Sequence, residues 1–197
     1  MAKPSKAATG QVRIIGGAWK KSVLHFPGVE GLRPTPDRVR ETLFNWLGQD
    51  LSGVRCLDLF AGSGALGFEA ASRSAKRVVL VEKDRAAFTA LQANAARISG
   101  ATAVLDIVHA DAMAYLAGAS ERFDLVFLDP PFRQNAFAAV LEHLPRLLGA
   151  GARVYVESAI PHEASGGWRE TKRARAGQVN YQLLEWSDDR SGLPRDV

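Results

Sequence analysis

The chain has 197 residues, of which 47% are hydrophobic and 23% charged, and its formal net charge at pH 7 is +4. This length predicts one globular domain whose core needs no structural metal or disulfide framework. The single cysteine, Cys56, lies in an apolar run, and the sequence contains no signal-peptide core or membrane-span pattern. These features exclude a secreted disulfide scaffold and an integral membrane protein, and they predict a soluble cytoplasmic protein.

Basic residues are concentrated at the N-terminal end. Residues 1–40 contain eight lysines and arginines and two acidic residues, whereas the rest of the chain contains 17 basic and 19 acidic residues. This pattern is typical of a near-neutral body with an appendage for a polyanionic partner, although a solvated arm without a partner is the alternative. We expect a flexible basic tail over residues 1–11, a partner-binding extension over 12–50 and the main domain over 51–197.

The extension begins with a predicted hairpin. Residues 12–15 and 22–26 have the composition of two short strands, and the glycines and lysines between them predict a turn. This turn displays Lys20 and Lys21.

A helix is predicted after a break in the chain at residues 31–34. Thr35 is expected to cap it, with Pro36 at its first position. Arg38 and Arg40 are predicted to lie outside its apolar face. That face consists of Val39, Leu43, Trp46 and Leu47.

From residue 55 onward, strand and helix patterns alternate, which predicts a parallel sheet covered on both faces. The predicted strands are 55–60, 77–82, 104–109, 123–128 and 152–157. The predicted helices are 64–74, 84–98, 111–117 and 134–148, the last ended by the glycines of 149–151. Two longer strands, 167–175 and 179–186, are expected to close the chain with a tight turn between them.

Residues 57–67 predict a strand that runs into a glycine turn and then a helix. Gly62, Gly64 and Gly67 match the dinucleotide fingerprint, and Glu82 follows Gly62 by twenty residues. Glycines at such a turn let a ligand approach the backbone closely, and an acid ending the next strand can bind two ribose hydroxyls. These features fit NAD and S-adenosylmethionine equally well.

Neighbouring acids favour S-adenosylmethionine. Asp58 puts a negative charge beside the loop, which suits a ligand with an ammonium and a sulfonium and disfavours a pyrophosphate. Asp111, just past the third strand, is placed to accept the adenine amino group. The spacing of the four histidines predicts no metal site.

The strand at residues 123–128 stops at Asp129, Pro130, Pro131 and Phe132. An exocyclic amine is a poor nucleophile because its lone pair is delocalised. The Asp129 carboxylate and the Pro130 carbonyl can each accept one N–H and localise that pair, and Asp129 can take the released proton. The prolines remove competing donors and fix the backbone, and Phe132 offers a face to a flipped-out base. A plain strand end followed by a turn is the alternative.

The chain resembles the RsmD-type bacterial enzymes that methylate N2 of a guanine in 16S ribosomal RNA. The resemblance is carried by residues 13–17, 31–35, 37–44, 58–67, 129–133 and 177–179. It implies a Rossmann-like class I methyltransferase fold, with a seven-stranded, mostly parallel sheet, helices on both faces and an antiparallel last strand. It also implies S-adenosylmethionine over the glycine loop and RNA against the hairpin. Lys20-Lys21-Ser22 stands where relatives tend to carry an Arg-Gly-Arg-type turn, and lysine lacks the bidentate fork of arginine.

These observations define three sets of candidate site residues. The catalytic set is Asp129, Pro130, Pro131 and Phe132. The cofactor set is Asp58, Phe60, Ala61, Gly62, Ser63, Gly64, Glu82, Asp111, Thr35 and Arg38. The RNA set is Arg13, Lys20, Lys21, Arg33, Arg40, Arg133, Lys172, Arg173 and Arg175. No metal is expected, and the expected partner of this monomer is 16S rRNA or a small-subunit assembly particle.

Four other functions share parts of this pattern. DNA adenine-N6 methyltransferases use the same acid-Pro-Pro-aromatic cluster but usually carry an additional target-reading region. Glutamine methyltransferases favour Asn at the position of Asp129. An NAD oxidoreductase is supported by the glycine fingerprint alone. A non-catalytic rRNA binder with this fold would be expected to have lost the acid or the aromatic residue of the cluster, and both are present.

Overall fold

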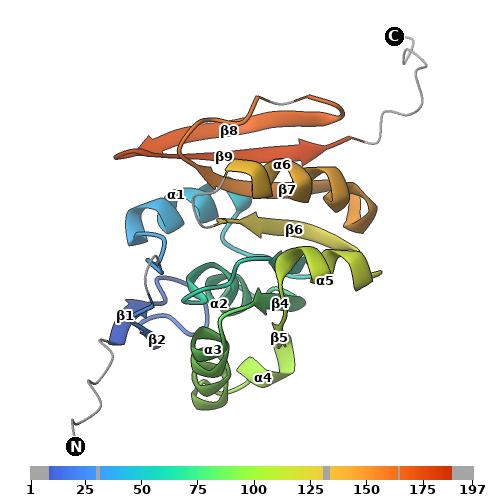
Figure 1. Ribbon diagram of the computed structural model, residues 1–197. Helices are drawn as coiled ribbons and strands as arrows, with labels where there is room; N and C mark the ends of the chain where they lie inside the picture. Colours follow the sequence, from blue (N-terminus) through green and yellow to red (C-terminus); the bar gives the residue numbers. More distant parts are fainter. Residues whose placement is uncertain (1–8, 30–31, 131–133, 164, 188–197) are drawn as a thin grey trace, which may run out of the picture.

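The computed structural model describes residues 9–29, 32–130, 134–163 and 165–187. Within these residues, a two-stranded hairpin lies beside a seven-stranded sheet that carries helices on both faces (Figure 1). This arrangement confirms the predicted fold class. No helix in the described part of the chain is both long and apolar enough to cross a membrane.

The hairpin consists of β1 (Thr9–Arg13) and β2 (Val23–Pro27), which pair antiparallel. The predicted tail boundary was therefore wrong, because residues 9–11 belong to β1. Glycine is uncommon in strands, so Gly10 gave no strand signal in the sequence. A Cβ at this position would lie 2.2 Å from the ring of Phe26. The glycine is needed so that this ring can lie across the partner strand.

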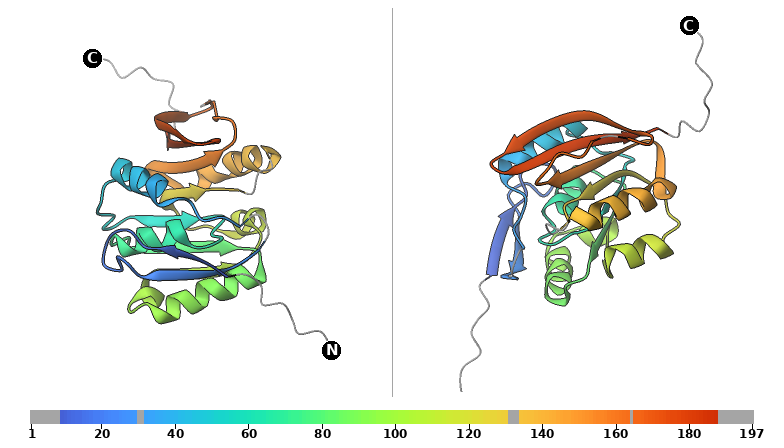
Figure 2. Two further views of the ribbon diagram at one scale, coloured as in Figure 1. Left: turned by 90° about the vertical axis from the view of Figure 1, so that its left-hand side faces the viewer. Right: turned by 45° about the horizontal axis from the view of Figure 1, so that its top comes forward.

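The hairpin lies beside α3 (Arg85–Arg97) (Figure 2), and hydrogen bonds join its backbone to side chains of that helix. Asn94 accepts from the backbone nitrogen of His25 at 3.0 Å and donates to its carbonyl at 2.8 Å. Arg97 donates to the carbonyl of Val23 at 2.7 Å. These bonds use backbone groups on the outer side of β2, so the strand edge is covered.

The sheet has the order β5-β4-β3-β6-β7-β9-β8. Its strands are β3 (Arg55–Asp58), β4 (Arg77–Glu82), β5 (Leu105–His109), β6 (Phe123–Leu128), β7 (Leu148–Ser158), β8 (Trp168–Ala176) and β9 (Val179–Trp186). Neighbouring strands from β5 to β7 pair parallel, and β9 runs antiparallel to both β7 and β8. The last strand is therefore antiparallel, as predicted.

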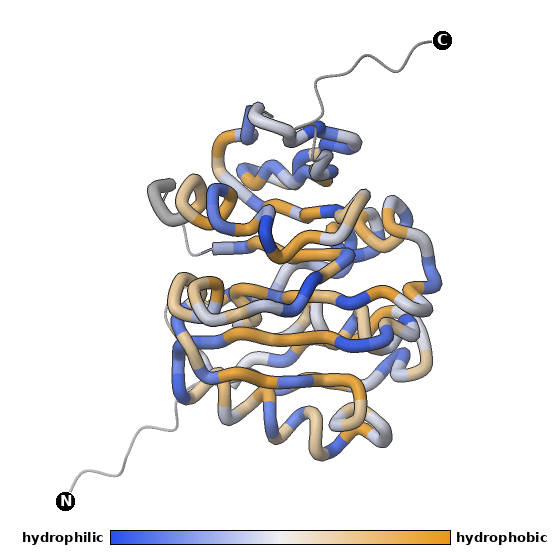
Figure 3. Tube along the Cα trace, turned by 90° about the vertical axis from the view of Figure 1, so that its right-hand side faces the viewer, coloured by the Kyte–Doolittle hydropathy of each residue, from blue (hydrophilic) through white to orange (hydrophobic). Residues whose placement is uncertain are grey.

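Alternate residues of each strand face two hydrophobic cores. Cys56, Val78 and Leu125 pack with α1 (Asp37–Leu47), α2 (Ala65–Ser72) and α3 on one face. Leu57 and Val126 pack on the other face with α5 (Ala112–Gly118), α6 (Gln134–His143) and the 3-10 helix η1 (Leu144–Leu147). A short helix, α4 (Ala101–Val104), precedes β5. The strands accordingly form hydrophobic bands through the centre of the molecule (Figure 3).

In the main domain, one helix was not predicted and one helix end was placed wrongly. Helix α4 was not predicted, because four residues are too few to show a helical period. The predicted helix end at residues 149–151 was also wrong, because β7 begins at Leu148, which pairs with Phe123. The register then shifts before Arg153 pairs with Leu125, so the glycines occupy an irregular stretch of the strand. The regular part of β7 coincides with the predicted strand.

Behind the glycine turn lies a buried ionic network centred on Glu69 of α2. Arg40 and Glu69 have 0% exposure and are 3.1 Å apart between Nη1 and Oε2. Arg73 pairs with the other oxygen of Glu69 at 2.8 Å and lies over the ring of Phe44. The same Oε2 accepts from the backbone nitrogen of Ile15 at 2.8 Å. One carboxylate thus connects the N-terminal segment, α1 and α2.

The predicted role of Arg40 as a phosphate contact was wrong. Its guanidinium donates to Glu69, to Asp37 and to the carbonyls of Arg13 and Thr35. Arg40 lies one turn before Leu43 and two before Leu47, so it belongs to the buried face of α1. An arginine is stable there because α2 supplies a carboxylate at the same depth.

Replacing Glu69 with Gln should lower the free energy of unfolding by about 3 to 5 kcal/mol, because two buried guanidinium groups lose their shared counter-charge. Urea denaturation measures this loss. Glu185→Gln is the control, since Glu185 pairs with the exposed Arg169 at the outer strands. That change should cost at most about 1 kcal/mol. Equal costs for the two variants would contradict a central role for Glu69.

Candidate active site at the carboxyl edge of the sheet

Four adjacent strands carry acids at their carboxyl ends. Asp58 ends β3, Glu82 ends β4, Asp129 follows β6, and Glu157 is the penultimate residue of β7. Asp58 and Glu82 are two residues beyond Cys56 and Leu80, which face the core of α1–α3. Because strand side chains alternate, these acids point to that same face, toward the start of α2. Open α/β sheets bind ligands at this edge.

The turn between β3 and α2 depends on glycines. Gly62 and Gly64 have φ values of +51° and +78°. A Cβ at Gly64 would lie 2.6 Å from Leu91 and 2.9 Å from Phe68, whereas one at Gly62 would meet no atom closer than 3.8 Å. Gly64 is therefore required by packing. Gly62 instead leaves the backbone accessible from outside.

Glu82 holds this turn in place. Its Oε2 accepts from the backbone nitrogen of Gly62 at 2.8 Å, and its Oε1 accepts from that of Asp84 at 2.6 Å. Each carboxylate oxygen keeps a second lone pair, so the group can still accept from a ligand diol. The partly buried Glu82 thus holds the turn through two hydrogen bonds and can still accept hydrogen bonds from a ligand.

Asp58 is buried at 3% exposure and accepts from the backbone nitrogen of Gly67 at 3.1 Å. Burial is the main cause that raises the pKa of Asp58 to about 7; the charges of Glu82 and Glu157 act in the same direction, and the hydrogen bonds from Gly67 and Phe60 act against it. A cationic ligand group nearby would favour its ionised form. The position of Asp58 beside the accessible glycine turn is suitable for such a ligand.

Asp129 and Glu157 lie next to each other at the ends of two neighbouring strands. Parallel pairing of Leu128 with Val156 puts these two acids side by side at the ends of β6 and β7. Burial, followed by the charges of Glu157 and Asp58, raises the pKa of Asp129 well above its usual value. Glu157 accepts from Tyr155 Oη at 2.9 Å and from Thr35 Oγ1 at 3.0 Å.

Glu157 was missed in the sequence analysis, although a usable signal was present. It follows the apolar run Val154-Tyr155-Val156, just as Asp129 follows the run that forms β6. An acid immediately after a buried strand is the pattern that identified Asp58, Glu82 and Asp129. Applying it to β7 would have found Glu157 as well.

The other members of the cofactor set lie at or near the same edge. Thr35 and Ser63 are buried, and Ser63 Oγ accepts from the nitrogen of Ala65. Asp111 caps α5 through Oδ1, which accepts from Met113 at 2.9 Å. Arg38 is exposed in the first turn of α1. Phe60 and Ala61 complete the turn before Gly62.

The described part of the catalytic set consists of Asp129 and Pro130, both partly buried. Pro131, Phe132 and Arg133 lie outside the described residues. Among the described residues, no group of three or more His, Cys, Asp or Glu side chains is arranged to hold a metal ion.

The lysines of the hairpin turn lie away from the acids. The nitrogens of Ala18 and Trp19 donate to Ser72, at the last residue of α2, while the glycine turn is at the first. Lys20 and Lys21 are exposed at this far end. Lys20 also lines a polar cavity of about 440 Å³ with Glu41, Asn45, Gln49 and Arg73 among others. Arg13 and Arg33 are exposed, and their predicted phosphate contacts stay a prediction.

The predicted basic cluster on β8 does not form one surface. Lys172 pairs with Leu183, whose side chain faces α1, whereas Arg173 pairs with Gln182 on the opposite side of the pleat. Arg173 forms an ion pair with Glu170 at 2.8 Å, and Arg175 donates to the carbonyl of Gly177. Adjacent residues of a strand point to opposite faces, so the separation of Lys172 from Arg173 already followed from the predicted strand.

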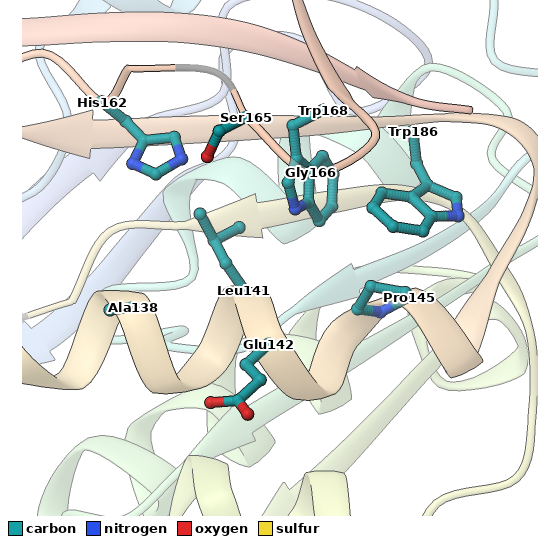
Figure 4. A pocket seen from close by; sticks show the side chains of 9 residues that line it. All are labelled: Ala138, Leu141, Glu142, Pro145, His162, Ser165, Gly166, Trp168 and Trp186. Atoms are coloured by element: carbon teal, nitrogen blue, oxygen red, sulfur yellow. The ribbon is translucent and has the colours of Figure 1, made fainter. Parts of the chain in front are cut away.

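A second cavity, of about 330 Å³, lies between α6 and the outer strands (Figure 4). Trp168 and Trp186 meet edge to face on one side of it, and Leu141 and Pro145 line the other. Its residues belong to the face opposite α1–α3. It is therefore separate from the acids at the carboxyl edge.

Comparisons with known proteins agree with this arrangement. A family model described as conserved hypothetical protein 95 matches residues 12–185. Ribosomal RNA small subunit methyltransferase D of Escherichia coli strain K12 is 42% identical over 190 residues, which cover 94% of this chain and 95% of the relative. The chain belongs to this methyltransferase family. The resemblance to RsmD-type enzymes is thereby confirmed.

Solved structures place the fold of this family member among methyltransferases. The Escherichia coli protein yhhF shares 42% identity and a TM-score of 0.80, with 90% of this chain and 98% of that chain covered. An RNA methyltransferase from Salinibacter ruber, solved in complex with S-adenosyl-L-homocysteine, has a TM-score of 0.62 at 18% identity and covers 83% of this chain. This second likeness concerns the fold alone.

Replacing Gly64 with Ala should destabilise the protein by about 2 to 4 kcal/mol, because left-handed backbone strain and overpacking against Leu91 and Phe68 act together. Gly53→Ala is the matched control, since Gly53 has φ +83° and nothing within 4 Å of a Cβ. It should cost about 1 kcal/mol through backbone strain alone. Thermal or urea unfolding compares the two, and equal losses would contradict the packing role of Gly64.

Proposed function

We propose that this protein transfers a methyl group from S-adenosylmethionine to N2 of a specific guanine in 16S ribosomal RNA. The observation that carries this proposal is the convergence of the glycine turn, Glu82 and Asp129 at the carboxyl ends of β3, β4 and β6. A cofactor-binding turn and a candidate amine-activating acid share one edge and one face of the sheet. Family membership supports the substrate class.

The residues around the glycine turn fit S-adenosylmethionine. Glu82 would hold the ribose hydroxyls with the lone pairs that Gly62 and Asp84 leave free. Asp58 suits the positively charged methionine end of the cofactor, and Asp111 keeps Oδ2 for the adenine amino group because both capping bonds use Oδ1. When bound, the cofactor supplies a methyl group whose bond to sulfur breaks as the bond to nitrogen forms.

Asp129 and the Pro130 carbonyl would activate the guanine amine. Each accepts one N–H, which localises the nitrogen lone pair, and Asp129 takes the proton after the new bond forms. The buried setting of Asp129 raises its pKa, which makes it a better proton acceptor than an exposed aspartate. Phe132 remains the predicted stacking surface for the extruded base.

RNA would contact the exposed basic residues of the N-terminal region, namely Arg13, Lys20, Lys21 and Arg33. Their positions follow the side of the molecule from the carboxyl edge, near Thr35, to the far end of α2. Phosphate contacts of this kind position the RNA but do not read its sequence.

The direct test is transfer of a radiolabelled methyl group from S-adenosylmethionine to small-subunit particles that lack the modification, followed by nucleoside analysis. The expected product is N2-methylguanosine in 16S rRNA. A parallel reaction with DNA that yields labelled N6-methyladenine would instead support the adenine methyltransferase alternative. Tight particle binding without transfer would support a non-catalytic assembly protein.

Asp129→Ala should slow single-turnover methyl transfer by about a hundredfold to ten-thousandfold, the usual range for a positioned acid–base group. Asp129→Asn is the sharper variant, because its amide oxygen accepts a hydrogen bond but does not take up a proton. Cofactor affinity, measured by calorimetry, should change little in either variant. Unchanged rates in both would show that Asp129 is a structural residue at the strand end.

Lys20→Ala combined with Lys21→Ala should flatten the log-log salt dependence of RNA binding by about 0.7 to 0.9 for each lost phosphate contact. Filter binding across a salt series measures this slope. The charge-matched control is Arg122→Ala with Arg146→Ala, two exposed positions outside the predicted interface. An unchanged slope in the lysine variant would mean that the turn is a solvated arm.

A further inference from the structure

We propose that Glu157 is a positioning residue for this reaction: held beside Asp129 by Thr35 and Tyr155, its negative charge assists Asp129 in taking up the proton that the amine releases. This inference rests on the proposed function. It concerns a residue that acts through Asp129 and does not itself need to touch the substrate.

The backbone brings the two carboxylates together. Leu128 pairs with Val156 and Phe127 with Tyr155 in the parallel ladder, so the next position places Asp129 beside Glu157. Neighbouring strands lie about 4.8 Å apart, and paired residues point to the same face. Phe127 and Tyr155 both pack in the core of α1–α3. The acids two residues further on therefore project toward that face, where Asp58 also lies.

Two hydroxyl groups fix the orientation of Glu157. Tyr155 Oη and Thr35 Oγ1 both donate to Oε1, at 2.9 and 3.0 Å. Thr35 and Tyr155 are themselves buried, so neither hydroxyl is free to turn into water. Oε1 accepts both bonds, and Oε2 accepts no hydrogen bond from another described residue. The orientation is thus set by neighbours more than a hundred residues apart in the chain.

The groups that act electrostatically on Asp129 from the surrounding elements are acidic. They are Glu157 and Tyr155 on β7 and Asp58 on β3, with Glu82 on β4 acting on Asp58. None of the ion pairs formed between described residues includes Asp58, Asp129 or Glu157. Glu157 therefore acts on Asp129 without an opposing cation from these pairs.

The proton balance shows why this charge is useful. As the methyl group bonds to nitrogen, the amine must lose one N–H proton while the bonding electrons stay on nitrogen. The proton goes to the Asp129 carboxylate, which becomes neutral, and release to water restores it. A neighbouring negative charge disfavours ionised Asp129 and so favours this transfer. Burial raises the pKa of Glu157, and the hydrogen bonds from Tyr155 and Thr35 oppose this rise and favour its charged form.

The direction of the pH effect follows from this arrangement. The reaction needs ionised Asp129, so its rate falls as the pH drops through the pKa of that group. Burial and then Glu157 raise this pKa. Removing the charge of Glu157 lowers it, so the acid limb of the pH profile should move to lower pH. The plateau rate should also fall, because a weaker base accepts the proton less readily.

The test uses the full chain and single-turnover methyl transfer across a pH series. Glu157→Gln keeps an oxygen for Thr35 and Tyr155 but removes the charge, and its acid limb should move down by about one pH unit or more. Glu157→Asp keeps the negative charge on a shorter side chain. The acid limb of its pH profile should stay near that of the unmodified protein. Asp106→Asn is the charge control. Asp106 lies on the distant edge strand β5 and pairs with Arg77 on β4.

An unmoved limb in Glu157→Gln would overturn the inference, and so would equal shifts in Glu157→Gln and Asp106→Asn. If Glu157→Gln does not fold, Glu157→Ala serves as the second neutral variant and is judged by the same shift. Failure of the proposed function looks different, because the unmodified protein would then transfer no methyl group to the particle.

Discussion

The structure depends on one buried carboxylate. Glu69 has no exposed surface, yet it accepts from two arginines and from the backbone of Ile15. A charge at that depth is stable only when it is paired and hydrogen-bonded. Meeting this condition draws the N-terminal segment, α1 and α2 together. The helix that begins at the glycine turn is thereby fixed from behind.

The acids at the carboxyl edge of the sheet differ from Glu69, because they have no cationic partner in the ion pairs of the described residues. Asp58, Asp129 and Glu157 are buried or partly buried, but none takes part in the ion pairs of the described residues. Such an arrangement is unfavourable for the isolated fold and is expected where a ligand or a reaction uses the charge. The protein therefore pairs the buried charge of Glu69 with arginines, whereas Asp58 and Glu157 at the carboxyl edge have hydrogen bonds but no ion pair among the described residues.

Much of this organisation could be predicted from the sequence. Apolar runs separated by helical patterns predicted the sheet, and acids after those runs located Asp58, Glu82 and Asp129. The role of Arg40 could not be predicted in this way, because its partner Glu69 lies on another helix. No local sequence pattern shows that both side chains are buried next to each other. The bond between Thr35 and Glu157 joins residues 122 positions apart. The bulge between Glu170 and Lys172, which shifts the register of β8, could not be predicted from the sequence either.

In the proposed mode of RNA binding, the docking of the hairpin turn at the far end of α2 determines which substrates can contact both surfaces. An eight-residue helix is about 12 Å long, so the glycine turn and Ser72 are separated by roughly that distance. A short oligonucleotide around the target guanine would occupy the carboxyl edge and leave the turn uncovered. Only an RNA whose fold brings a second backbone segment alongside the first has a footprint that reaches both ends. Under the proposed function, the spacing of these two surfaces would make binding depend on how the RNA is folded.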